Sequence, residues 1–65
     1  MTSRANSLLT EIKKLADHLR QEIDEAQEYY QQGDMTNTLR SLNASDDELQ
    51  TMFNKWRELK NEIDS

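Results

Sequence analysis

The chain of 65 residues has no cysteine, no proline, one glycine and one histidine. The absence of cysteine excludes the disulfides and thiolate metal sites that small domains often use to compensate for a small core. A single histidine excludes a cluster of imidazole ligands. We therefore expect no metal and no cofactor, and a fold that depends on the packing of apolar side chains.

Long apolar runs are also missing. No stretch has the roughly 18 apolar residues that a membrane-spanning helix needs, and the polar residues 1–7 lead into no apolar segment of a signal peptide. We expect a cytoplasmic protein with no membrane association. Apolar residues make up only 34% of the chain and the net charge is −5, which approaches the composition of disordered proteins. The wealth of Leu, Glu, Gln, Lys and Arg nevertheless favours helix.

The first half of the chain has the apolar periodicity of a helix over residues 3–32. Apolar residues recur at spacings of three and four, with one polar interruption at Glu22, and a second row follows directly after the first. This stripe is wider than a two-stranded coiled coil requires. The first row is Ala5, Leu8, Ile12, Leu15, Leu19, Ala26 and Tyr29, and the second is Leu9, Ala16, Ile23 and Tyr30.

The second half predicts another helix, over residues 35–64, in which four apolar residues lie seven apart. An alternative is a break near residues 43–46, because Ser45 to Glu48 has the S-x-x-E pattern of a capping box. We expect one continuous helix, because the apolar phase is preserved across this segment. Its apolar residues are Met35, Leu39, Leu42, Leu49, Met52, Phe53, Trp56, Leu59 and Ile63.

Between the two helices, Gly33 follows the last periodic residue, where a left-handed helix cap is common, and Asp34 or Thr36 can begin the next helix. The fold class is therefore all-α, an antiparallel hairpin of two long amphipathic helices in one domain, 1–65. Folding about the turn predicts facing pairs whose residue numbers sum to about 68. These pairs are Ala5–Ile63, Ile12–Trp56, Leu15–Met52 or Leu15–Phe53, Leu19–Leu49, Ala26–Leu42 and, among polar residues, Glu22 with Ser45 or Asp46.

A two-helix layer covers each apolar side chain only in part, so we expect a partner that completes a four-helix bundle. A second copy is the simplest partner, since twofold dimers are the commonest oligomers, and another helical protein is the alternative. The predicted interface consists of Leu8, Leu9, Ile12, Leu15, Leu19, Ile23, Tyr30, Leu39, Leu42, Leu49, Met52, Phe53, Trp56, Leu59 and Ile63.

Charge is divided unevenly along the predicted hairpin. The turn half, residues 21–48, has eight acids and one base, whereas the open half, residues 1–20 and 49–65, has seven bases and five acids. Opposite orientation of two copies would place each acidic turn half beside a basic open half, which predicts an antiparallel dimer. The acids of the turn half include Glu22, Asp24, Glu25, Glu28, Asp46, Asp47 and Glu48.

No residue pattern predicts catalysis. The consecutive acids at residues 46–48 lack the spacing of a calcium loop, and His18 has no nucleophile placed beside it in the sequence, so we expect a solvated histidine and no enzyme. We expect a small interaction module, an adaptor, regulator or assembly chaperone, with no small-molecule substrate. The alternative is a nucleic-acid-associated regulator, which the net acidity disfavours. Its candidate basic face is Lys13, Lys14, Arg20, Lys55 and Arg57.

Residues 26–34, with an alanine, a tyrosine and Gly-Asp at the turn, resemble the inter-helix segment of tetratricopeptide repeats over about a seventh of the chain. The small residue that such a repeat has in its next helix is Thr38 here, so we interpret the likeness as shared turn chemistry. In size, acidity and layout the chain also resembles plasmid RNA-binding dimers of helical hairpins and small type III secretion chaperones. Those likenesses involve no motif.

Overall fold

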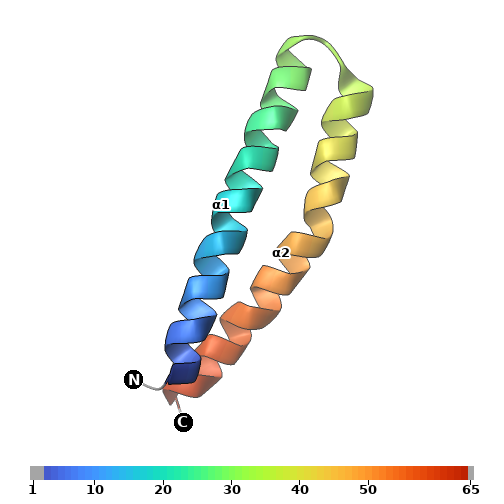
Figure 1. Ribbon diagram of the computed structural model, residues 1–65. Helices are drawn as coiled ribbons and strands as arrows, with labels where there is room; N and C mark the ends of the chain where they lie inside the picture. The colour runs from blue at the N-terminus through green and yellow to red at the C-terminus, as the bar shows by residue number, and fades with distance from the viewer. Residues whose placement is uncertain (1–2, 65) are drawn as a thin grey trace.

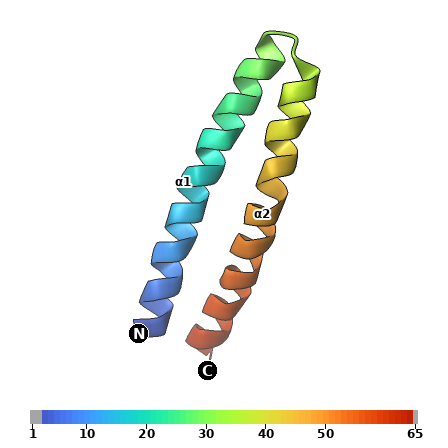
Figure 2. The ribbon, with the colours of Figure 1, turned by 45° about the vertical axis from the view of Figure 1, so that its right-hand side comes forward.

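The computed structural model describes residues 3–64 as two α-helices, α1 (Ser3–Gln31) and α2 (Met35–Asp64). The helices run side by side in opposite directions, so that the start of α1 and the end of α2 lie at the end away from the turn (Figure 1, Figure 2). The molecule measures 48 by 15 by 12 Å, which is one layer of two helices. The predicted all-α hairpin is confirmed, with each helix boundary within one residue of the prediction.

The turn is a Schellman motif followed at once by a helix cap. Gly33 has a φ of +79°; its N–H donates to the Tyr30 carbonyl at 3.0 Å, and the Asp34 N–H donates to the Tyr29 carbonyl at 2.9 Å. The Asp34 carboxylate then accepts from the Asn37 N–H at 3.1 Å and from the Asn37 side-chain amide at 2.6 Å. These bonds hold the pKa of Asp34 below its usual range. Gly33 therefore ends α1 as expected, and of the two candidates for the cap of α2, Asp34 and Thr36, it is Asp34 that accepts these bonds.

Substituting Gly33 with alanine should cost about 1–2 kcal/mol, the penalty of an L side chain in the left-handed region. A Cβ at this position would meet no atom within 4 Å, so the backbone alone sets the cost. Asparagine tolerates this conformation better, and Gly33→Asn should lose clearly less. Urea unfolding of both variants, followed by circular dichroism, measures the difference. Equal losses in the two variants would contradict a backbone origin.

Helix α2 continues through residues 43–46, which confirms one unbroken helix. Ser45 lies inside it, where its hydroxyl bonds the Glu22 carboxylate of α1 and lies 3.0 Å from the Ser41 carbonyl. The predicted contact of Glu22 with the Ser45 region is thus confirmed. The S-x-x-E pattern begins no helix here, because the serine hydroxyl serves an interhelical contact instead.

The apolar core lies toward the open end of the hairpin. Ala5, Leu8, Ile12 and Leu59 form one buried cluster, with Leu9 and Met52 packed against it. Farther along α1, Leu19 and Ala26 are also buried, but the residues buried on α2 beyond the cluster are polar, namely Thr38 and Ser45. The interface between the helices is therefore apolar near the chain ends and partly polar near the turn.

Four of the predicted facing pairs, those that use Leu42, Leu49, Trp56 or Ile63, are wrong. The α2 row of Leu42, Leu49, Trp56 and Ile63, expected to face α1, is 45–61% exposed. The row that faces α1 starts four residues earlier and consists of Thr38, Ser45, Met52 and Leu59. Four residues correspond to a rotation of about 40° around the helix. This rotation places the Ser45 hydroxyl on the Glu22 carboxylate and turns the more apolar row of α2 outward.

Candidate interaction surface

One side of the hairpin, the apolar flank, carries exposed or half-buried apolar residues from both helices. Each α1 member directly follows an inward-facing residue, and in two antiparallel helices such rows lie along the same edge. Nine large side chains of the flank are 45–64% exposed. The flank consists of Leu9, Ala16, Ile23 and Tyr30 of α1 and Met35, Leu39, Leu42, Leu49, Phe53, Trp56 and Ile63 of α2.

A groove of about 500 Å³ runs between the helices within this flank. Its presence shows that the two rows share one edge, because residues of both helices line it. The small side chain of Ala16 leaves the space, and large side chains of α2 form the opposite wall. The Arg57 guanidinium lies 5.8 Å from the centre of the Phe53 ring. The lining residues are Ile12, Ala16, Leu49, Met52, Phe53 and Trp56.

The opposite side, the polar flank, is crossed by ion pairs that join the helices. Arg4 lies 2.7 Å from Glu58, and Lys55 lies 2.8 Å from Glu11. The hydrogen bond and positive charge of Lys55 hold the pKa of Glu11 below its usual range. Exposed pairs are individually weak, but opposite charges at matched heights favour this register of the two helices.

His18 is the third crossing point of the polar flank. Its Nδ1 lies 2.8 Å from a Glu48 oxygen of α2 and 3.5 Å from a Glu22 oxygen one turn along α1. The hydrogen bond and charge of Glu48 raise the pKa of His18, and the charges of Glu22 and Glu25 act in the same direction. The Ser45 hydroxyl is the main cause of the lowered pKa of Glu22. The His18 Nδ1 thus lies between a carboxylate of α1 and one of α2.

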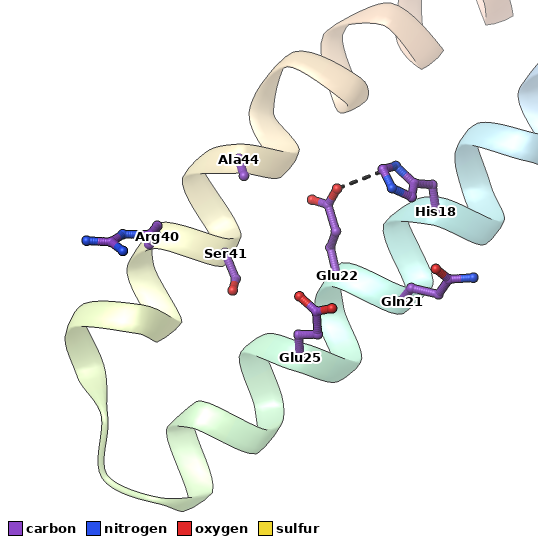
Figure 3. Close-up of a pocket in the computed structure, with 7 residues that line it drawn as sticks. All are labelled: His18, Gln21, Glu22, Glu25, Arg40, Ser41 and Ala44. Carbon is purple, nitrogen blue, oxygen red and sulfur yellow. Dashed lines mark ion pairs between the residues drawn. The ribbon is translucent and has the colours of Figure 1, made fainter.

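A cavity of about 290 Å³ lies beside this cluster, toward the turn. Figure 3 shows Glu22, Glu25 and Ser41 extending into the space between the helices, while Arg40 points away from α1. Ligand atoms of His18, Glu22 and Glu48 lie within 4.8 Å of one another, so these three residues could hold a cation. The cavity is lined by His18, Gln21, Glu22, Glu25, Arg40, Ser41 and Ala44.

Stability should fall as the pH rises above about 6.5, because the pKa of His18 is higher in the folded chain than its unfolded value of about 6.5. The stabilisation is complete below the unfolded pKa and disappears as the pH passes the folded one. Thermal unfolding across this range should show the fall in the native chain but not in His18→Gln. The same fall in the variant would exclude His18 as its source.

The basic residues of the candidate nucleic-acid face do not share one side. Lys55 is paired with Glu11 on the polar flank, whereas Arg57 lies over Phe53 on the apolar flank. Lys13, Lys14 and Arg20 are exposed on α1. Among the acids of the turn half, Glu22 and Glu48 converge on His18, and Asp46 and Asp47 point to solvent.

The structure divides the predicted interface into buried, half-buried and exposed residues, and Leu9, Leu15 and Met52 are half-buried. Leu8, Ile12, Leu19 and Leu59 are at most 8% exposed and lie between the two helices, so they offer almost no surface to another chain. The exposed members belong to the apolar flank. Of the paired tyrosines, Tyr30 is 64% exposed and Tyr29 is half-buried, as their adjacent positions predict.

Comparisons with protein-family models, with curated proteins and with solved structures found no match. Neither α1 nor α2, within residues 3–64, is both long and apolar enough to cross a membrane. The apolar flank and the polar flank are therefore the features on which a functional argument can rest.

Proposed function

We propose that this chain is a non-enzymatic protein–protein interaction module that acts by packing its apolar flank against other helices. The observation that carries the proposal is the 45–64% exposure of nine large apolar side chains. Seven of the nine lie on α2, and the other two, Ile23 and Tyr30, continue the flank on α1. Contiguous apolar surface of this kind marks interaction sites in folded proteins, whereas scattered apolar residues do not.

The shape of the flank favours a helical partner. Its rows repeat every seven residues on two long helices, which is the spacing that the side chains of a packed helix match. The groove of about 500 Å³ at Ala16 is open to knobs from such a helix. A β-strand partner would instead need unpaired backbone groups at a sheet edge, which the two described helices do not present.

Site-specific photo-cross-linking tests the proposal with a matched pair of positions. Ala16 and Ala44 are both exposed alanines, but Ala16 lines the groove of the apolar flank and Ala44 lines the cavity of the polar flank. A photoreactive residue at position 16, in cells that express the chain, should give one adduct of defined mass. The same residue at position 44 should give little.

A second substitution shows whether the adduct depends on the flank. Phe53 is 58% exposed, so Phe53→Glu should abolish the adduct at position 16 without loss of helicity. Equal adducts from positions 16 and 44, or an adduct that persists in Phe53→Glu, would contradict the proposed function.

A further inference from the structure

We propose that the occupant of the apolar flank is a second copy of this chain, packed antiparallel about a twofold axis that passes near Ala16. This inference rests on the proposed function and names its partner. It is supported by the area of the flank, by the charges that border it and by the position of the groove along the hairpin.

The area of the flank matches what a stable dimer buries. Nine side chains are about half exposed, and a large aromatic side chain offers roughly 200 Å² in full exposure, so the flank presents at most about 1,000 Å². Standard interfaces bury about 800 Å² on each partner. Because the flank spans both helices of a layer 48 Å long, a second two-helix layer covers it along its whole length. The product is a four-helix bundle with short connections.

The charges beside the flank determine the orientation. We count a residue as bordering when it lies three or four positions from a flank residue, hence on the neighbouring helix surface. By this criterion two acids, Asp34 and Asp46, border the flank in the turn half, and four bases border it in the open half. Parallel copies would stack the bases, whereas antiparallel copies bring Asp46 toward the partner's bases. The bordering bases are Lys13, Arg20, Arg57 and Lys60.

The charges of the whole molecule are distributed in the same way as those that border the flank. The turn half has eight acids against one base, and the open half has seven bases against five acids. An antiparallel pair therefore places a half of net charge −7 beside one of +2, whereas a parallel pair would place two halves of −7 side by side. Long-range charge and bordering charge favour the same arrangement.

The groove lies close to the middle of the hairpin. Ala16 is one residue from the midpoint of α1, and Leu49 is at the midpoint of α2. A twofold axis through the middle gives the largest overlap of two flanks, and it sets the two grooves opposite each other. Phe53 and Trp56 of each copy then lie near the axis, where aromatic anchors contribute most to binding. Ala16 meets its own equivalent, and its small side chain permits close approach.

Cysteine cross-linking tests this geometry, because the chain has no cysteine of its own. In the antiparallel dimer, Ala16→Cys should form an intermolecular disulfide in a glutathione buffer roughly ten times faster than Ala44→Cys, which lies on the opposite flank. In a parallel pair α1 faces the partner's α2, so two residues at position 16 would not meet. Circular dichroism checks that both variants keep their helicity.

Sedimentation equilibrium from about 1 µM to 1 mM should give the mass of two chains at the upper end. A dimer whose Ala16→Cys and Ala44→Cys variants oxidise at equal rates would overturn the antiparallel arrangement. A monomer throughout, with a photo-adduct to a different protein at position 16, would overturn self-association and leave the proposed function intact. A monomer with no adduct would overturn both.

Discussion

Substituting Leu8 with alanine should lower the free energy of unfolding by about 2–5 kcal/mol, the usual cost of an emptied leucine site in a core. Leu8 is the largest fully buried side chain in residues 3–64, at 1% exposure, and it packs with Ala5, Ile12 and Leu59. A chain of this length is stable by only about 3–10 kcal/mol. The variant should therefore lose much of its helicity at moderate temperature.

Lys14→Ala is the matched control for this truncation. Lys14 lies on the same helix, has a long side chain and is exposed, so its loss should change stability by no more than about 0.5 kcal/mol. Urea unfolding of both variants at one protein concentration, followed by far-ultraviolet circular dichroism, gives the comparison. Similar midpoints for the two variants would show that the cluster around Leu8 is not the stabilising core.

The local chemistry of the turn made the hairpin predictable. Gly33, the one glycine of the sequence, adopts a left-handed conformation without a steric penalty, and Asp34 supplies an acceptor for the N–H groups that begin α2. The spacing of the apolar residues predicted the lengths of the two helices. The polar position Glu22 also predicted its contact, since a carboxylate between helices requires a donor, and Ser45 provides one.

The rotation of α2 could not be predicted in this way. An apolar row shows which side of a helix avoids water, but it does not show which helix covers that side. The outer row of α2 contains Leu42, Leu49 and Trp56, yet it is the row with Thr38 and Ser45 that faces α1. The prediction assumed that the most apolar row faces the other helix of the hairpin. The polar contact between Glu22 and Ser45 favours the observed rotation instead.

The His18 cluster escaped prediction for a related reason. Glu22 is four residues from His18, so its proximity follows from the helix, but Glu48 is 30 residues away and reaches His18 from the other helix. Its approach depends on the rotation of α2. The acidic run at residues 46–48 indicated charge near the turn but did not indicate which of the three carboxylates faces inward.

Substituting Trp56 with alanine should weaken the proposed dimer by about a thousandfold. A tryptophan anchor at the centre of an interface contributes at least about 2 kcal/mol, and the twofold axis removes two copies at once, which gives about 4 kcal/mol. Trp56 is 51% exposed in a single hairpin and lies outside the buried cluster. Sedimentation equilibrium should therefore show dissociation at concentrations where the native chain is dimeric.

The matched control is Asn61→Ala, because Asn61 is exposed on the same helix and lies about 140° around it from Trp56. The Asn61→Ala dimer should dissociate at the same protein concentration as the native dimer. If Asn61→Ala weakened association as much as Trp56→Ala, the contacts would lie outside the apolar flank. If neither variant weakened the association of the two copies, Trp56 would not be an anchor of the interface. The twofold axis would then not pass near Ala16. A loss confined to Trp56→Ala follows only if the row of α2 turned away from α1 is the row that packs against a second copy.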